Sequence, residues 1–344
     1  MLLHLNAVRL FILKTPIPRY NTHMSETLYD TIILGGGPAG LTAAIYTSRA
    51  HLKTLIIGGR PSGGQLIDTT DVENYPGFPE GILGPDLIAT FRKQATRFGA
   101  EHVEENATSI LSSAEEGFTV KTDEGKEFKS KTIIIATGAS AKWLDLESVH
   151  KLRGKGVTAC ATCDGFFFKG KVVAVVGGGD VAMEEAIYMT KFSPKVYVLV
   201  RGDREAMKAS KFMQKRATEN DRIEFMFNAE VKEVLGENSV SGILVVNSKT
   251  GEEKRMEDVK GLFMAIGHEP NTKFLEGFIE VGAKGYIEPI SNTKTSKEGV
   301  FVAGDVGDWR YRQAVTAAGF GCMAAMDVEK YLAEKEGRAL SPAY

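Results

Sequence analysis

The sequence is poor in cysteine and has no long hydrophobic run, and both shortages exclude classes of protein. Three cysteines among 344 residues are too few for a disulfide-stapled secreted scaffold, so we expect a reducing compartment. A membrane span needs about 18 consecutive apolar residues, and no such run is present. Lys and Arg total 42 against 44 Asp and Glu, so the net charge of -2 favours neither nucleic-acid nor membrane binding.

Acidic residues are missing from the first 23 residues, which contain Arg9, Lys14 and Arg19. The apolar run 8–13 is interrupted by Arg9, which is untypical of a secretory signal. Two interpretations remain: an organelle transit peptide, or a disordered upstream extension with Met24 as the working start. The first predicts a mitochondrial protein and the second a cytoplasmic one, and we leave residues 1–23 out of the predicted fold.

Glycine is abundant at 37 residues, and two dense clusters of it stand out in a chain long enough for roughly two domains. In the first cluster, the β-rich run 27–34 ends in Gly35-Gly36-Gly37-Pro38-Ala39-Gly40, and small apolar residues follow at helical spacing. Strand, glycine turn and helix in this order predict a dinucleotide site. Gly35 permits the tight turn, Gly37 lets the backbone approach a pyrophosphate, and Gly40 lets helix and strand pack. The alternative is a tight turn without a ligand.

A second cluster repeats the pattern. Gly177-Gly178-Gly179-Asp180-Val181-Ala182 follows the apolar run 171–176, with alanine at the third glycine position. The next strand ends in Arg201, where an acid would hold the ribose of NAD, so a 2′-phosphate and therefore NADP is favoured. After the corresponding strand of the first cluster stands Gly58-Gly59-Arg60, again without an acid, so no ribose contact is assigned there.

Cys160 and Cys163 stand two residues apart between the two glycine clusters, with Asp164 directly after them. Such a pair can close a small disulfide, and an adjacent acid can pass a proton when it opens. Two nucleotide sites around a dithiol indicate an electron relay from nicotinamide through flavin to disulfide. Zinc is the alternative, but a closed site needs two further ligands, and neither Cys322 nor the six histidines have the spacing, so no metal is predicted.

Taken in order, these motifs resemble the low-molecular-weight thioredoxin reductases over a stretch from about Leu28 to Leu332. The resemblance is carried by the two glycine clusters and the cysteine motif together with Gly63-Gly64-Gln65-Leu66, Val72-Glu73-Asn74-Tyr75-Pro76-Gly77, Ala136-Thr137-Gly138-Ala139, Ala265-Ile266-Gly267-His268, Ala303-Gly304-Asp305-Val306 and Tyr311-Arg312-Gln313-Ala314.

The resemblance implies an α/β fold with two Rossmann-like dinucleotide-binding domains, the NADPH domain being inserted into the FAD domain. Residues 24–140 and 268–334 would form the FAD domain, 141–267 the NADPH domain with the redox disulfide, and 335–344 a tail. It also implies a homodimer in which the inserted domain rotates, because dithiol and nicotinamide must reach one flavin in turn. The hinges would be the two short crossings near 139–142 and 267–271.

The resemblance also implies roles for individual residues. Cys160 and Cys163 would be the redox pair and Asp164 the general acid–base beside them, unless its carboxylate caps the next turn instead. Asp305 would hydrogen-bond the ribityl chain of the flavin. The residues expected to contact FAD are Gly35, Gly37, Pro38, Ala39, Gly40, Gly64, Gln65, Asn74, Thr137, Gly138, Asp305, Arg312, Gln313 and Ala314. Those expected to contact NADPH are Gly177, Gly179, Asp180, Glu184, Arg201 and Lys208.

The loop after the strand that ends in Arg201 departs from the pattern of the family, which usually has a His-Arg-Arg-x-x-x-Arg cluster there. Gly202 replaces one arginine, Lys208 stands for the trailing arginine, and the loop is about two residues longer. Lysine offers a point charge and not the two-pronged donor that suits a phosphate. The departure therefore predicts a weakened preference for NADPH over NADH.

Three functions remain open. The first is a reductase that passes electrons from NADPH through FAD and the Cys160–Cys163 disulfide to oxidised thioredoxin. The second is a related flavin dithiol enzyme with another partner or a relaxed nicotinamide preference. The third is a non-enzymatic flavin- and nucleotide-binding sensor, which an intact cysteine pair followed by Asp164 disfavours.

We assign no function to three other features. We expect Cys322 to be a packing residue, His268 to be a loop histidine without a catalytic role, and 166–168 to pack in the core or at a domain interface.

Overall fold

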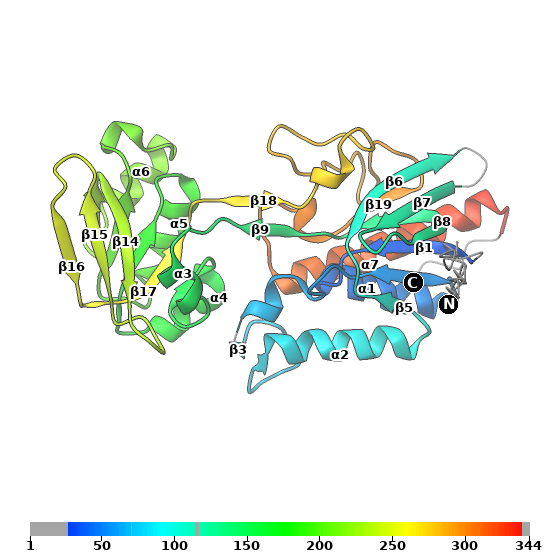
Figure 1. Cartoon of the computed structure of the whole chain (residues 1–344), viewed down its shortest axis with the longest axis horizontal. Coiled ribbons are helices and arrows are strands. Elements are labelled where there is room, and N and C mark those ends of the chain that lie inside the picture. The colour runs from blue at the N-terminus through cyan, green and yellow to red at the C-terminus, as the bar shows by residue number, and fades with distance from the viewer. Residues whose placement is uncertain (1–26, 70, 114–116, 339–344) are drawn as a thin grey trace, which may run out of the picture.

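Two β-sheets, each covered by helices, form the two halves of the molecule (Figure 1). The computed structural model describes residues 27–69, 71–113 and 117–338, so the predicted leader 1–23 and the end of the predicted tail lie outside the described residues. The larger sheet has the order β5–β2–β1–β8–β7–β6, and β19 also pairs with β8. Its strands are β1 (Leu28–Leu34), β2 (Thr54–Ile57), β5 (Glu101–Val103), β6 (Ala107–Ser113), β7 (Gly117–Thr122), β8 (Glu127–Ile135) and β19 (Val300–Val302).

The central strands of this sheet are hydrophobic along their whole length because both faces are covered. β1 lies parallel to β2 and β8, and the runs 32–34 and 133–135 are fully buried. One face packs against α1 (Pro38–Arg49), α2 (Gly84–Arg97) and α7 (Ala314–Lys335). The other face packs against side chains of β6, β7 and the segment 274–287.

The small residues of α7 allow it to cross α1 at close range. A Cβ placed on Gly321 would lie only 2.1 Å from the backbone oxygen of Ala39, so any larger residue would push the helices apart. Ala317, Ala318, Ala324 and Ala325 are buried along the same helix. The C-terminal helix is thereby held against the first glycine turn, where α1 begins.

The smaller sheet is entirely parallel and has the order β10–β17–β11–β12–β13. One of its faces carries α4 (Ala161–Asp164), α5 (Asp180–Met189) and α6 (Lys211–Thr218), and the other carries α3 (Glu147–Leu152) and a three-stranded antiparallel sheet. The strands are β10 (Val157–Thr158), β11 (Val172–Val176), β12 (Val196–Val200), β13 (Ile223–Phe227), β14 (Ala229–Leu235), β15 (Gly242–Asn247), β16 (Glu253–Met256) and β17 (Val259–Met264).

Two chain crossings connect the halves, and they lie side by side as a two-stranded antiparallel ribbon (Figure 1). β9 (Ala139–Ala141) pairs with β18 (His268–Pro270). The ribbon is extended at its ends by backbone hydrogen bonds from Lys142 N to Gly267 O at 2.9 Å and from Asn271 N to Gly138 O at 3.0 Å. The predicted hinge segments 139–142 and 267–271 are therefore the residues that form this ribbon.

Short elements complete the described part of the chain: β3 (Asp71–Val72), β4 (Ile82–Leu83) and the 3₁₀ turns η1 (Gly64–Asp68), η2 (Gly165–Phe168), η3 (Arg204–Ala206), η4 (Lys273–Leu275) and η5 (Gly304–Val306). No helix within residues 27–338, the masked gaps aside, is both long and apolar enough to cross a membrane.

The predicted elements are present, with shifted ends. The sequence pattern predicts a strand at 54–57, which is present as β2, and a strand at 131–136, whereas β8 begins four residues earlier at Glu127. It also predicts a helix from 317 to about 335, and α7 begins three residues earlier at Ala314. Its first turn is closed by side-chain bonds between Gln313 and Thr316, an arrangement that reverses the usual Ser/Thr-then-Glu order and so was not predicted. The residue boundaries of the two domains stay a prediction.

Candidate active site

The cysteine pair forms a disulfide at the start of α4. Cys160 occupies the position before the helix, and its Sγ accepts the backbone N–H of Cys163 at 3.2 Å. Ala161 is buried against the smaller sheet's helical layer, whereas Thr162 and Cys163 are exposed. The sequence prediction of a redox disulfide at these residues is confirmed.

Gln313, from the other half of the molecule, lies directly against this disulfide. Its Oε1 is 4.0 Å from the sulfur of Cys163, and its Nε2 is 4.0 Å from the sulfur of Cys160. The same amide nitrogen donates a hydrogen bond to Thr162 Oγ1 at 3.2 Å, and Asn74 Nδ2 donates to Gln313 Oε1 at 3.4 Å. The fold thus brings together the redox pair and two residues predicted to contact FAD.

Asp164 faces inward and not toward the next turn. Its carboxylate accepts a hydrogen bond from Thr158 Oγ1, and the turn that starts at Gly165 has no side-chain cap. The alternative role as a capping carboxylate is therefore wrong. Burial raises the pKa of Asp164, and the Thr158 hydroxyl partly opposes that shift. A carboxyl group with a raised pKa one residue from Cys163 is suited to hold a proton there.

The two glycine turns are built in the same way. At Gly35 (φ +119°) a Cβ would lie 2.2 Å from the oxygen of Ala136, and at Gly177 (φ +148°) it would lie 2.4 Å from that of Ala265. Only glycine fits where the turn passes so close to the neighbouring strand's end. A Cβ at Gly179 would meet no other atom within 4 Å, so the backbone at the start of α5 is open. Each turn leads into the N-terminus of a helix, which fits a phosphate.

Asp305 provides a polar group that the folded chain leaves unused. Its Oδ1 is shielded from solvent and has no hydrogen-bond partner among the described residues. Burial raises its pKa to about 7, with Asp308 acting in the same direction and Arg312 opposing. Buried polar atoms are rarely left unpaired, so this oxygen, just beyond the end of β19, fits a hydroxyl-bearing ligand such as a ribityl chain.

Three residues predicted to contact FAD also contact the ribbon that joins the halves. Gln65 Nε2 donates to Ala139 O at 2.6 Å, and Thr137 Oγ1 donates to Asn271 O at 2.9 Å. Arg312, which has a left-handed backbone (φ +48°), contacts Nδ1 of His268 through its Nη1. The first nucleotide site and the ribbon are therefore physically connected.

His268 is a strand residue and not the loop histidine that the sequence suggested. It begins β18, and its ring faces Arg312. Burial and the neighbouring guanidinium lower its pKa to about 4, so the imidazole is neutral near pH 7. The prediction for the phenylalanines 166–168 was also only partly right. Phe168 is buried against Phe263, but Phe166 is 59% exposed beside the disulfide helix.

At the second glycine turn, the loop that follows β12 folds back onto the turn. Oδ1 of Asp180 accepts hydrogen bonds from the N–H and the hydroxyl of Ser210 at 2.8 and 2.9 Å, and Lys208 N donates to Gly178 O at 2.8 Å. Arg201 and Glu184 are exposed, as is the side chain of Lys208. The predicted NADPH residues thus gather at one edge of the smaller sheet.

The loop departure at Gly202 has a steric origin. A Cβ on Gly202 would lie 2.5 Å from the Cβ of Ala206, closer than real side chains approach. Ala206 is held there by the turn η3, whose start is capped by the carboxylate of Asp203. A larger side chain at position 202 would therefore collide with this turn, which is the steric reason for glycine there.

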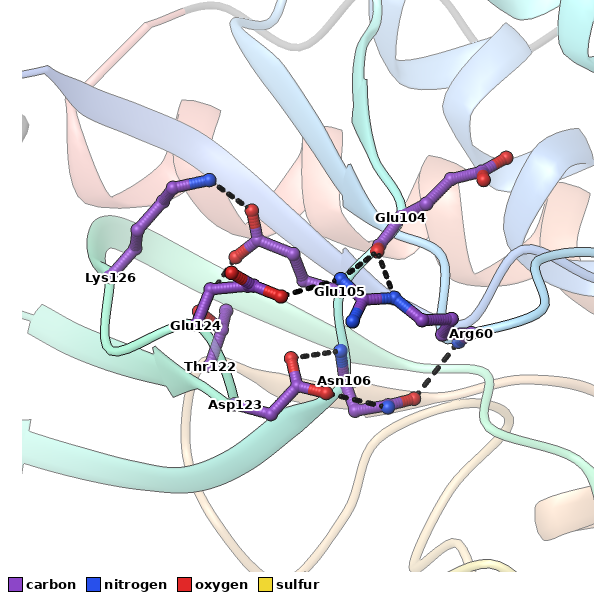
Figure 2. Close-up of polar contacts among 8 residues, drawn as sticks. All are labelled: Arg60, Glu104, Glu105, Asn106, Thr122, Asp123, Glu124 and Lys126. Carbon is purple, nitrogen blue, oxygen red and sulfur yellow. Dashed lines mark hydrogen bonds and ion pairs between the residues drawn. The ribbon is translucent and has the colours of Figure 1, made fainter.

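Arg60 follows β2, at the place where an acid would hold a ribose. Its side chain is hydrogen-bonded to other protein groups (Figure 2). Its guanidinium donates to the backbone oxygen of Glu104 at 3.1 and 3.2 Å and pairs with Glu124 at 2.9 Å. Its backbone N–H donates to Asn106 Oδ1, and the amide of Asn106 in turn donates to Asp123. This network anchors the loop after β2 to the β7–β8 turn, so Arg60 is a structural residue.

Comparison with known proteins decides the family. Residues 29–321 match the family described as pyridine nucleotide-disulphide oxidoreductase. The chain belongs to this family. A thioredoxin reductase of Mycolicibacterium smegmatis is 45% identical over 313 residues, which cover 91% of this chain and 99% of that protein. The NADPH-dependent thioredoxin reductase 3 of Arabidopsis thaliana is 50% identical over 327 residues, and this chain spans 60% of that protein's length.

The solved structure of the thioredoxin reductase from Giardia duodenalis is also similar to this pyridine nucleotide-disulphide oxidoreductase. It superposes with a TM-score of 0.85 at 41% identity and covers 90% of this chain and 100% of its own. This likeness confirms the predicted α/β class with two Rossmann-like dinucleotide-binding units and the resemblance to low-molecular-weight thioredoxin reductases. The individual cofactor contacts stay predictions.

Sequence reasoning missed two hydroxyl groups around the disulfide of this oxidoreductase. Thr158 donates to Asp164 and also accepts the backbone N–H of Cys160 at 3.2 Å. Thr162 Oγ1 lies 3.3 Å from the sulfur of Cys160 and receives the amide of Gln313. A threonine near a Cys-x-x-Cys motif does not by itself predict a functional role, because its hydrogen-bond partners are set by tertiary packing.

Proposed function

We propose that the protein is an NADPH-dependent thioredoxin-disulfide reductase that passes electrons from NADPH through FAD and the Cys160–Cys163 disulfide to oxidised thioredoxin. One observation carries the proposal: a surface disulfide lies against Gln313, at the junction between two units that each have a glycine-turn nucleotide site. Names of similar proteins point the same way, since thioredoxin reductases share 45–50% of their residues with this chain.

We assign FAD to the first glycine turn, where the chain's features fit it. The open backbone at the start of α1 would hold the pyrophosphate, and the unpaired Oδ1 of Asp305 would accept a ribityl hydroxyl. When bound there, FAD supplies the two-electron chemistry that links a nicotinamide to a disulfide. Gln313 and Arg312 would border its ring, because both come from the segment that leads from β19 to the disulfide contact.

Asp164 would manage the protons of the cysteine pair. Breaking the sulfur–sulfur bond with two electrons leaves two sulfur anions, which take up two protons to become thiols. Asp164 is adjacent to Cys163, and burial raises its pKa, which favours the protonated form that can pass a proton to that sulfur. The reverse transfer would restore a thiolate for attack on the disulfide of a partner.

We also propose that the β9–β18 ribbon is a hinge. The disulfide and the second glycine turn lie on the same unit, and both must reach one flavin on the other unit. In the arrangement described, the disulfide faces Gln313, so a nicotinamide bound at the second glycine turn needs a different orientation. Among the described strands, β9 and β18 pair only with each other, so this two-stranded ribbon is suited to absorb such a rotation.

A homodimer is part of the proposal. Tyr46 on α1 and Met323, Met326 and Val315 on α7 are exposed apolar residues, and we call them the α1–α7 patch. The helices pack against each other, and the hydroxyl of Tyr46 is hydrogen-bonded to Cys322, which directly precedes Met323. Exposed apolar residues gathered on adjacent helices are typical of an interface between subunits.

We further propose a cytoplasmic location, or a mitochondrial one if residues 1–23 are a transit peptide. N-terminal sequencing of the native protein would decide between them.

The function is tested by mixing the FAD-loaded protein with NADPH and oxidised thioredoxin and following NADPH absorbance. We expect NADPH to be consumed in proportion to the thioredoxin disulfide added. Reduction of the flavin without reduction of thioredoxin would overturn the proposed substrate but leave a flavin dithiol enzyme. Failure of NADPH to reduce the flavin at all would overturn both.

A second candidate is a flavin dithiol enzyme with another partner or with relaxed use of NADH. The observation that favours it is the loop beside Arg201, where Gly202 and the side chain of Lys208 leave fewer two-pronged donors for a 2′-phosphate. Steady-state rates with NADPH and NADH side by side, using thioredoxin as acceptor, separate this candidate from the first.

A further inference from the structure

Glu185 is an acid within the buried stripe of α5. Residues 182, 185, 186 and 189 lie on one face of this helix, and the other three are the fully buried Ala182, Ala186 and Met189. An acid at such a position is costly unless it has a partner. The next residue back, Glu184, is exposed, so the two adjacent acids have opposite environments.

The partner of Glu185 is the disulfide helix itself. α5 packs against α4, and the carboxylate of Glu185 accepts the backbone N–H of Ala161, the residue directly after Cys160. Its Oε2 is shielded from solvent and has no hydrogen-bond partner among the residues that the structure describes. One carboxylate oxygen of Glu185 thus contacts the redox motif, and the other has no protein partner among the described residues.

α4 needs such an anchor. It has only four residues, which is too short for its internal hydrogen bonds to keep it folded. The disulfide staples residues 160 and 163 while it is closed, but the staple is lost each time the bond is reduced. A hydrogen bond from outside the helix keeps the backbone between the two sulfurs in place in both states.

We propose that Glu185 is a positioning residue for the Cys160–Cys163 pair, which fixes the backbone between the sulfurs through Ala161 and alters the reactivity of the reduced pair when it ionises. This inference rests on the proposed function, because it assumes that the pair cycles between disulfide and dithiol. It concerns a residue that neither the redox motif nor the predicted cofactor contacts include.

The charge state of Glu185 depends on groups from both halves of the molecule. Burial raises its pKa to about 8, and the carboxylates of Asp164 on α4 and Glu184 on α5 act in the same direction. Arg312, from the segment before α7, is the opposing cation. Below pH 8 the group is therefore mainly neutral, and above it the carboxylate places a negative charge beside Cys160. A nearby negative charge raises the pKa of a thiol and slows thiolate reactions.

The test compares Glu185→Gln, which keeps the acceptor oxygen but cannot ionise, with Glu185→Ala, which removes the acceptor. Glu237→Gln is the matched control, because Glu237 is an exposed acid of the same unit. Each FAD-loaded protein is reduced with dithiothreitol, freed of it, and alkylated with iodoacetamide at pH 6.5 and 9. Mass spectrometry then gives the rate at Cys160 and Cys163 separately from Cys322. The disulfide–dithiol equilibrium is measured in glutathione buffers.

We expect Glu185→Gln to match the native protein at pH 6.5 and to be alkylated faster than it at pH 9. Glu185→Ala should shift the disulfide–dithiol equilibrium about tenfold at both pH values, the scale of one lost hydrogen bond to a buried group. Glutamine has the same size and shape as glutamate, so the Glu185→Gln variant tests the proposal even if the alanine variant folds poorly.

Equal behaviour of the native protein and both variants would overturn the proposal, as would an equal shift in Glu237→Gln. Neither measurement uses NADPH or thioredoxin. The proposed function can therefore fail in the thioredoxin assay while the role of Glu185 stands, and the reverse is equally visible.

Discussion

The carboxyl groups of Asp164, Glu185 and Asp305 belong to partly buried side chains, and their surroundings differ. Asp164 receives a threonine hydroxyl, Glu185 a backbone N–H from the disulfide helix, and one oxygen of Asp305 receives no hydrogen bond from any described residue. Burial raises the pKa of all three. Buried acids of this kind gather at functional sites because the fold must hold them against their preference for water.

Cys163→Ser should abolish reduction of the thioredoxin disulfide, because a serine hydroxyl cannot form the sulfur–sulfur bond. The flavin should stay bound, since no cofactor contact is assigned to Cys163. The measurements are NADPH consumption with thioredoxin and the visible spectrum of the purified protein. Cys322→Ser is the matched control and should keep full activity. A colourless Cys163→Ser protein would mean that the redox pair has been placed wrongly.

Asp305→Ala should weaken FAD binding by about tenfold or more, because it removes the buried acceptor offered to the cofactor. The measurement is the flavin-to-protein ratio after dialysis, together with the flavin dissociation constant. Asp308→Ala is the control, since Oδ1 of Asp308 accepts the N–H groups of Arg310 and Tyr311 and serves its own turn. Equal flavin loss in both variants would indicate general disruption of the segment and contradict the role of Asp305.

At the scale of elements, the loop 201–210 folds back onto the second glycine turn. The turn η3 places Ala206 over Gly202, and hydrogen bonds from Lys208 and Ser210 tie the far end of the loop to the glycine turn. The loop therefore presents Arg201 as the arginine next to the end of β12. We therefore expect this element, and not the glycine turn, to decide which nicotinamide cofactor is preferred.

Arg201→Ala should raise KM for NADPH about tenfold and leave KM for NADH nearly unchanged, since only NADPH has the 2′-phosphate. Steady-state kinetics with both cofactors and thioredoxin as acceptor measure the difference. Arg216→Ala, on the exposed side of α6, is the matched control. Equal changes for both cofactors would show that Arg201 does not contact the phosphate.

At the scale of the whole molecule, two sheets are joined by a ribbon of two strands, and the redox disulfide meets Gln313 from the opposite half (Figure 1). Hydrogen bonds from Gln65 and Thr137, two residues predicted to contact FAD, reach the backbone of the ribbon. We therefore expect FAD binding and the orientation of the smaller unit to be coupled through these residues.

Met326→Glu should convert the protein from a dimer to a monomer, because a charge in the α1–α7 patch would be buried without a partner in the interface. Sedimentation velocity at micromolar concentration measures the change. Phe212→Glu introduces the same charge at an exposed apolar residue of the smaller unit and should leave the dimer intact. A native protein that sediments as a monomer would contradict the proposed homodimer directly.

The amino-acid sequence alone determined the features that depend on local spacing. Glycine turns after apolar strands, a cysteine pair with an acid beside it and the order of the motifs are all encoded within a few residues, and they gave the fold class and the redox disulfide. The glycines are needed because the turns at Gly35 and Gly177 pass within van der Waals distance of a neighbouring strand's end.

Only the tertiary structure decided which distant side chains meet. In the sequence, Glu184 and Glu185 are two adjacent acids without distinction, and only the packing of α4 on α5 separates their environments. His268 is predicted to lie in a loop, and only the pairing of β18 with β9 shows that it is a strand residue. Gln313 reaches the disulfide across a separation of 150 residues. Such contacts depend on how helices and strands pack, and no short pattern of residues specifies them.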